Sequence, residues 1–113
     1  MTRVSRIPVE KERMRDFIDD FWSAVASLES KEEAKRFFND FLTPTEVKMF
    51  AKRFQVAILL LGGYNYQAIR NFIKVTDATI AKVNNWLAEG RVGLENIAQR
   101  ILILKKKKLE RKE

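Results

Sequence analysis

The side chains best suited to chemistry in this sequence follow Val75. Thr76 offers a hydroxyl and Asp77 a carboxylate, at the point where the apolar spacing predicts that a helix begins. Thr76 is a good N-cap, and an acidic residue in the first turn interacts favourably with the helix dipole. A helix that follows a short turn in this way can enter the major groove of DNA and contact base edges with its N-terminal side chains. The chemistry predicted for this stretch is therefore hydrogen bonding to bases.

The elements that must position these side chains have the apolar spacing of a helix-turn-helix. Ile69 and Ile73 are one helical turn apart, as are Ile80 and Val83, and Val75 falls between the two pairs. Two short helices with this spacing bury their facing sides against each other, and one apolar residue fills the angle at the turn. We therefore predict a helix-turn-helix within residues 64–90.

Two positions depart from the usual helix-turn-helix pattern. Lys74 stands where the turn commonly has glycine, which adopts a left-handed backbone without strain. Arg70 stands where close helix packing favours a small residue. These departures leave open a second interpretation, in which the hairpin packs a core and does not touch DNA.

Composition excludes several classes of function. The chain of 113 residues predicts a single domain, residues 1–113, with one core of moderate size. It contains neither Cys nor His, which excludes disulfides, a Cys/His metal site, a cysteine nucleophile and the usual general base. No pair of acidic residues stands out, so we expect no enzyme activity, no metal and no cofactor. No 18-residue apolar run or signal-like N-terminus is present, so we expect a soluble, cytoplasmic protein with no membrane partner.

The net charge of +7 is unevenly distributed. Residues 1–60 hold 11 basic and 10 acidic side chains, whereas residues 61–113 hold 11 basic and 5 acidic side chains. The second half contains the predicted reading helix and ends in a basic tail, residues 105–113. This distribution favours a polyanionic partner, because basic side chains neutralise phosphates. The alternative is a solvated tail that only improves solubility.

Helical periodicity and capping signals predict an all-α fold of six helices, with no strand pattern and no internal linker. Thr43, Pro44 and Glu46 form the strongest start signal, because a capping threonine, a proline at the first helical position and a reciprocal glutamate coincide. Ser30 and Glu33 have the same capping spacing. We predict a flexible arm at residues 1–8 and, outside the hairpin, helices over about 9–28, 30–42, 43–61 and 93–104.

Large apolar side chains are more numerous than a chain of this length can cover alone. They recur at helical spacing and predict core, not a ligand surface. The helix over 43–61 is apolar on several sides near its end, which favours burial against a second subunit. The surplus that predicts a two-fold dimer consists of Phe17, Phe21, Trp22, Phe37, Phe38, Phe41 and Phe54.

Several of these segments resemble the Trp repressor superfamily. The match is better to the smaller Trp-repressor-like regulators of the YerC/YecD type, and it covers about Phe41 to Leu87. The segments that carry it are Leu42-Thr43-Pro44, Arg53, Leu59-Leu60, the glycine turn, Tyr66-Gln67-Ala68-Ile69, and Ala78-Thr79-Ile80-Ala81-Lys82-Val83-Asn84.

The resemblance implies an intertwined homodimer whose two reading heads lie on the outside and bind double-stranded DNA. It places Thr76, Asp77, Ala78, Thr79 and Lys82 at or near base edges. It implies that Tyr66, Gln67 and Arg70 contact phosphates, which position a protein on DNA without specifying sequence. From their charge, Lys105, Lys106, Lys107 and Lys108 are expected to contact phosphates as well.

The resemblance also implies half of a ligand pocket. In the Trp repressor, a threonine and two arginines hold tryptophan, and a glycine leaves room for the indole. Thr43 and Arg53 match the threonine and one arginine, but Lys82 replaces the other arginine and Val83 replaces the glycine. Lysine cannot make the planar, bidentate hydrogen bonds that arginine makes to a carboxylate. The valine side chain would fill the space of the indole. We therefore expect no tryptophan corepressor and no small-molecule effector.

Together these observations predict a dimeric, sequence-specific transcriptional regulator. Two alternatives stay open. One is a non-specific nucleic-acid-binding protein that uses its basic C-terminal half, and the other is a helical protein-interaction module.

Overall fold

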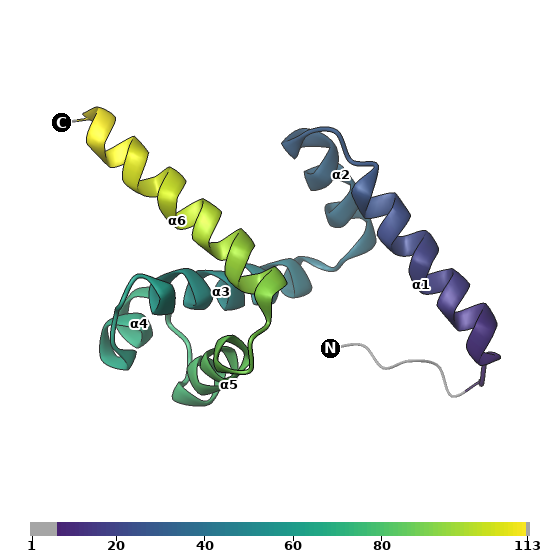
Figure 1. Cartoon of the computed structure of the whole chain (residues 1–113), viewed down its shortest axis with the longest axis horizontal. Coiled ribbons are helices and arrows are strands. Elements are labelled where there is room, and N and C mark those ends of the chain that lie inside the picture. The colour runs from purple at the N-terminus through teal and green to yellow at the C-terminus, as the bar shows by residue number, and fades with distance from the viewer. Residues whose placement is uncertain (1–6, 113) are drawn as a thin grey trace. The chain divides into compact units, whose positions relative to one another are not determined.

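A computed structural model describes residues 7–112, and this part of the chain forms six helices and no strand (Figure 1). This confirms the predicted all-α, six-helix fold. Most of the predicted arm at residues 1–8 lies outside the described residues. The chain divides into two compact units, residues 1–47 and 48–113. The helices are α1 (Lys11–Ala26), α2 (Lys31–Phe41), α3 (Pro44–Leu61), α4 (Tyr66–Ile73), α5 (Asp77–Ala88) and α6 (Val92–Lys112).

Side-chain caps start α2 and α3 where the sequence predicts. Glu46 N donates to Thr43 Oγ1 over 3.1 Å, and Thr43 N donates to Glu46 Oε1 over 2.9 Å, which confirms the predicted capping box before α3. The Thr43 backbone N–H and, second to it, the Thr43 hydroxyl hold the pKa of the Glu46 carboxyl below its ordinary value of 4.5. At α2, Glu33 N donates to Ser30 Oγ over 3.1 Å.

The first unit contains α1 and α2, whose aromatic side chains meet. The ring centroids of Phe21 and Phe37 are 6.4 Å apart, and the rings of Phe37 and Phe41 stack at 5.6 Å. Yet no described residue of either helix is buried, and Trp22 and Phe41 are 60% and 63% exposed. A single chain thus does not bury the aromatic stripes that we expected in its core, because two adjacent helices cannot enclose large rings on all sides.

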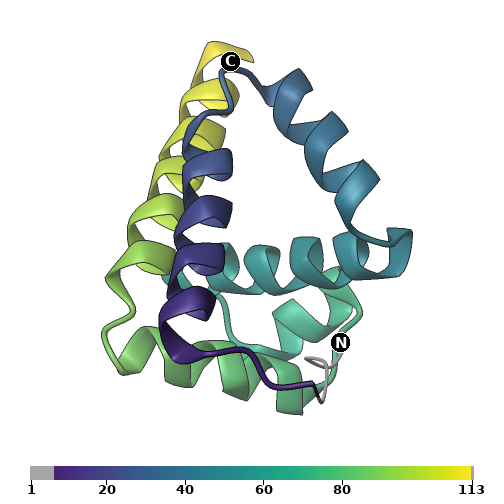
Figure 2. The ribbon, with the colours of Figure 1, turned by 90° about the vertical axis from the view of Figure 1, so that its right-hand side faces the viewer.

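The second unit has a buried core of its own, to which all four of its helices contribute. In both views α4 and α5 lie on one side of α3 (Figures 1 and 2). Three consecutive α3 residues are buried, so the end of this helix is covered from several directions, as its apolar character predicts. The buried residues are Val56, Ala57, Ile58, Ile69, Ile80, Val83 and Ala98.

A glycine ends α3, whereas α6 continues through the predicted basic tail. Gly63 ends α3 with φ 87°, and Tyr64 N donates back to Leu59 O over 3.1 Å, the arrangement for which glycine is preferred. The basic tail predicted at residues 105–113, by contrast, continues α6 as far as Lys112. None of the helices within residues 7–112 is long and apolar enough to cross a membrane.

Candidate nucleic-acid interface

Lys74 makes the turn between α4 and α5. Its φ of 62° and ψ of 57° place it in the left-handed region, which confirms the prediction that this residue replaces the usual glycine. The conformation costs a residue with a Cβ about 1–2 kcal/mol. Lys52 Nζ donates to the carbonyl oxygen of Lys74 over 3.2 Å and thereby ties the turn to α3.

Apolar packing holds α4 and α5 together beneath this turn. Ile69 and Ile80 are 0% exposed and Val83 is 1% exposed, while Ile73 and Val75 are half-buried and pack against the same core. All five apolar positions singled out in the sequence therefore face the interior. Because the core fixes these five, the opposite side of α5 is free to meet a partner.

The N-terminus of α5 presents most of the predicted base-reading residues. Thr76 has extended backbone angles, and its hydroxyl accepts from Thr79 N over 3.3 Å, which confirms the predicted cap. Thr76 Oγ1 and Thr79 Oγ1 are 3.2 Å apart, so the two hydroxyls share a hydrogen bond. Asp77, Ala78 and Lys82 are exposed, whereas Thr79 is half-buried.

An ion pair joins α4 to α5 beside this surface. Arg70 Nη1 lies 2.7 Å from Asp77 Oδ1, and the two side chains are 41% and 62% exposed. Arg70, which we predicted to contact phosphates, therefore forms an ion pair with Asp77, which we predicted to read bases. Sequence reasoning missed this pair, although opposite charges on either side of a tight turn were a usable signal.

The remaining predicted phosphate contacts lie on α4 and α6. At the start of α4, Gln67 is exposed and Tyr66 half-buried, behind a cap in which Asn65 Oδ1 accepts from Ala68 N over 2.9 Å. The four lysines 105–108 are exposed on α6, and Lys105 Nζ donates to Gln55 Oε1 over 3.3 Å. Consecutive residues on a helix point in different directions, so these lysines surround α6 and do not form a single face.

The four residues of the expected vestigial pocket have separate structural roles. Val83 is part of the core, with 1% of its surface exposed. Arg53 is half-buried, and Lys82 is exposed on α5 among the residues predicted to read bases. Thr43 belongs to the first unit, where it caps α3, while the other three belong to the second. The valine side chain is thus part of the protein interior.

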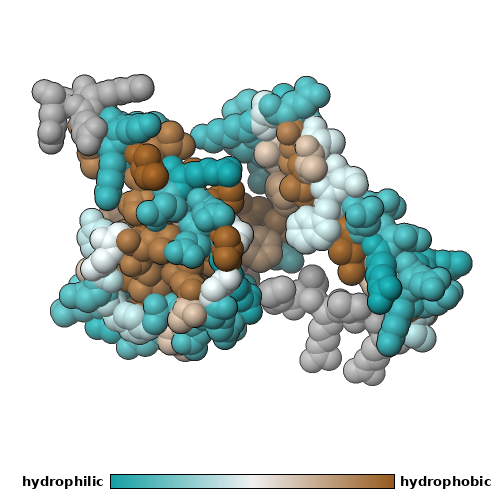
Figure 3. Space-filling view, viewed as in Figure 1, coloured by the Kyte–Doolittle hydropathy of each residue, from teal (hydrophilic) through white to brown (hydrophobic). Residues whose placement is uncertain are grey.

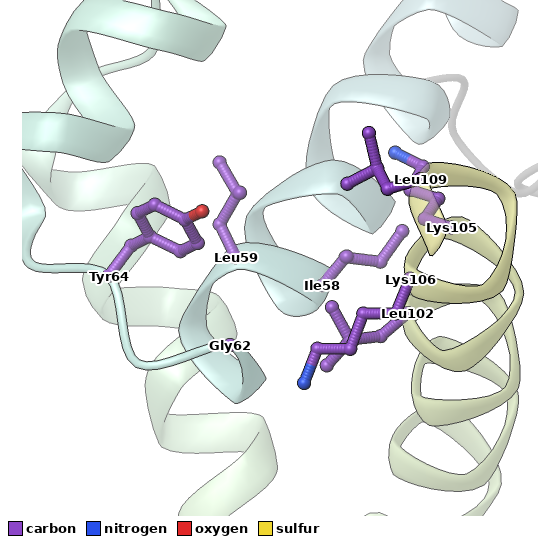
Figure 4. A pocket seen from close by; sticks show the side chains of 8 residues that line it. All are labelled: Ile58, Leu59, Gly62, Tyr64, Leu102, Lys105, Lys106 and Leu109. Atoms are coloured by element: carbon purple, nitrogen blue, oxygen red, sulfur yellow. The ribbon is translucent and has the colours of Figure 1, made fainter. Parts of the chain in front are cut away.

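Apolar surface also remains open in the second unit. A groove of about 290 Å³ lies between α3 and α6, and Figure 4 shows Ile58 and Leu102 pointing toward each other across it. A neighbouring hollow of about 180 Å³ is lined by Leu59, Tyr64, Ala68 and Phe72. Figure 3 shows the apolar surface of this unit in brown. The groove is lined by Ile58, Leu59, Gly62, Tyr64, Leu102, Lys105, Lys106 and Leu109.

Within residues 7–112, no group of three or more His, Cys, Asp or Glu side chains is placed to hold a metal ion. The chemistry that the described surface offers is hydrogen bonding from the starts of α4 and α5, positive charge from α6, and apolar contact from the groove.

Comparison with known proteins gives a consistent result. Residues 16–105 match the model of the family described as Trp repressor protein. The uncharacterized protein YerC of Bacillus subtilis (strain 168) is 32% identical over 84 residues, which cover 74% of this chain and 81% of YerC. A TrpR-like protein from Eubacterium eligens has a similar structure, with a TM-score of 0.72, 30% identity, and 76% of this chain and 89% of that chain covered. A candidate Trp repressor from Staphylococcus aureus also has a TM-score of 0.72 and 30% identity, with 83% and 95% of the two chains covered.

Proposed function

The chain belongs to the Trp repressor family, and we propose that it is a sequence-specific, DNA-binding transcriptional regulator that acts as a homodimer. One observation carries this proposal: α5 is held from below by buried Ile80 and Val83, while Asp77, Ala78 and Lys82 at its start are exposed. A rigid helix with exposed polar side chains at its N-terminal end is the geometry that a helix-turn-helix uses in the major groove.

Base edges and phosphates would be contacted by different parts of this surface. We propose that Thr76, Asp77, Ala78, Thr79 and Lys82 face the bases. Tyr66 and Gln67, at the start of α4, would contact phosphates and fix the position of α5 on the duplex. Lys105 to Lys108 would add attraction to any duplex, although α6 turns them in different directions. Arg70, also predicted to contact phosphates, is engaged by Asp77 in this structure.

Exposed apolar side chains support the homodimer. Phe17, Trp22 and Phe41 of the first unit are at least half exposed, and the groove beside Leu102 and Leu109 in the second unit is open to solvent. Large exposed apolar patches mark interaction surfaces. We propose that a second copy covers them, with the N-terminal helices of each chain wrapped around those of the other. The two reading helices would then lie one DNA turn apart, ~34 Å.

Tryptophan is not part of the proposed mechanism. Val83 is 1% exposed, and we propose that its side chain fills the space that a ligand would need, so the angle of the reading helix would be fixed without an effector. Calorimetry with millimolar L-tryptophan should detect no saturable heat, and DNA affinity should not depend on the amino acid. A saturable signal accompanied by tighter DNA binding would refute this part of the proposal.

The function is tested by comparing a reading residue with a residue that supplies only charge. Lys82→Ala should reduce affinity for the preferred duplex by roughly 1–3 kcal/mol and leave affinity for unrelated duplexes much less changed. Lys107→Ala removes the same charge from α6 and should weaken binding to all duplexes alike. The slope of log affinity against log salt concentration should become shallower by about one, the value for one lost phosphate contact. Both affinities are measured over a range of salt concentrations.

The alternatives give different results in the same experiment. A non-specific binder loses nearly all affinity at physiological salt and shows the same loss for both variants. A helical protein-interaction module binds no duplex even at low salt.

A further inference from the structure

Arg70 and Asp77 meet where α5 begins, at the part of the helix proposed to enter the groove. Arg70 Nη1 engages Asp77 Oδ1 over 2.7 Å, and 62% of the Asp77 side chain remains exposed. An ionised carboxylate offers about four lone-pair sites on its two oxygens, and Arg70 occupies only part of this capacity. The carboxylate is thus held in one orientation and still able to accept a further hydrogen bond.

We propose, resting on the DNA-binding function above, that Asp77 selects cytosine at one position of each half-site and that Arg70 is its positioning residue. An ionised carboxylate only accepts hydrogen bonds, so it is repelled by the major-groove acceptors of guanine and thymine. Cytosine presents the N4 amino donor there. Adenine also presents an amino group, but beside the acceptor N7, which disfavours a carboxylate.

Arg70 makes this selection possible on a polyanion. A lone carboxylate close to the phosphate backbone would be repelled by it, whereas the guanidinium compensates its charge at a distance of 2.7 Å. The pair also restricts the Asp77 side chain before DNA arrives, so less rotational freedom is lost on binding. Stability alone explains the pair poorly, because exposed ion pairs contribute little to folding.

The neighbouring contacts keep the geometry of the pair constant. Lys52 fixes the Lys74 carbonyl in the turn that separates the two residues, and Thr76 caps α5 directly before Asp77. The start of α5 is therefore held by the turn and the cap even if Arg70 is replaced, and Arg70 sets only the direction of the carboxylate.

The test uses the full-length chain and selection of binding sites from a random duplex pool. Asp77→Asn should change the preferred base at a single position of each half-site from cytosine toward adenine, which asparagine reads with two hydrogen bonds. Discrimination in favour of cytosine at that position should fall by roughly 10-fold or more. Arg70→Gln should weaken the same preference without shifting it to another base, and Arg70→Lys should restore part of it.

A matched control lies at the other end of α5, where Glu89 Oε2 is 3.6 Å from Arg91 Nε and both side chains are more than half exposed. Glu89→Gln removes the same charge at the C-cap of α5 and should leave base preference unchanged. Thermal unfolding of each variant accompanies the selection, because a purely structural pair would alter unfolding and not base preference.

Four results would overturn the inference. If Asp77→Asn tightens binding to all duplexes equally, the carboxylate only screens Arg70 or the backbone. If thermal stability changes while the preferred base does not, the pair is structural. If the unmodified chain selects no sequence, the proposed function fails and the inference falls with it. A wild-type preference that Asp77→Asn leaves intact refutes the inference alone.

Discussion

The two units of this chain use apolar side chains in opposite ways. In residues 48–113, Ile58, Ile69 and Ile80 are almost completely buried by four helices. In residues 1–47, α1 and α2 carry large aromatic rings, but none of their described residues is buried. The second unit therefore resembles a small domain with its own core. The first resembles half of a core that another surface must complete.

This difference separates two contributions to stability. Burial within the second unit is present in one chain, so its contribution does not depend on protein concentration. Burial of the aromatic rings of the first unit would come from association, and its contribution would depend on concentration. The proposed reading helix, α5, belongs to the unit that forms its own core, so its packing depends on residues of that unit.

The largest effect is expected from a cavity in the core of the second unit. Ile80→Ala removes a side chain that is 0% exposed, and it should lower the free energy of unfolding by roughly 2–5 kcal/mol. Chemical denaturation at several protein concentrations measures this. The loss should be similar at each concentration, and a loss that vanishes at high concentration would place this residue in the association surface instead.

A smaller, concentration-dependent effect is expected from the first unit. Trp22 is 60% exposed in one chain, so Trp22→Ala should cost little unless a second copy covers the ring. In the proposed dimer, it should weaken association by about 2 kcal/mol, which is typical of a central aromatic contact. Sedimentation equilibrium measures the dissociation constant, with Ser23→Ala as the control on the same helix. A wild-type chain that is monomeric at tens of micromolar would contradict the dimer.

The turn of the second unit should yield a small gain. Lys74→Gly relieves the left-handed strain at φ 62° and should stabilise the chain by about 1 kcal/mol. The hydrogen bond from Lys52 goes to the backbone oxygen, so it should survive the substitution. Thermal unfolding compares this variant with Asn71→Gly, a change in the helix interior that should be destabilising. Loss of stability at Lys74→Gly would show that the lysine side chain contributes more than the strain costs.

The smallest effect concerns pH and the capping box before α3. The pKa of Glu46 is lowered in the folded chain, so its carboxylate stabilises the fold above its ordinary value of 4.5, and this contribution is lost as pH falls through the lower folded value. Glu46→Gln keeps an oxygen that can accept from Thr43 N but does not titrate. Its stability should therefore decline less between neutral pH and acid than that of wild type, measured by thermal unfolding, with Glu29→Gln as the control. An equal decline would contradict this assignment.

Local signals made much of this fold predictable. Three features depend only on residues a few positions apart in the sequence: the capping box of Thr43 and Glu46, the glycine end of α3, and the left-handed backbone at Lys74. Helix ends were less certain: α1 runs from Lys11 to Ala26, two residues shorter at each end than predicted.

Some contacts between helices were not predicted. The opposite charges of Arg70 and Asp77 on either side of the turn were a usable signal for their ion pair, but the bond from Lys52 to Lys74 depends on the relative positions of α3 and the turn, which no local pattern indicates. Continuation of α6 through the lysine tail was accessible in principle, because lysine, leucine, glutamate and arginine all favour helix. The sequence could not show that the apolar residues of the second unit are buried while those of the first are exposed, because both sets have the same helical periodicity.

Selection of binding sites from a random duplex pool tests the central claim most directly. A dimer that reads DNA with α5 should enrich one two-fold symmetric site at physiological salt, with its half-sites centred about one helical turn apart. Enrichment should weaken clearly with Lys82→Ala and persist unchanged with Lys107→Ala. Duplex binding that enriches no sequence, or no binding even at low salt, would contradict the account.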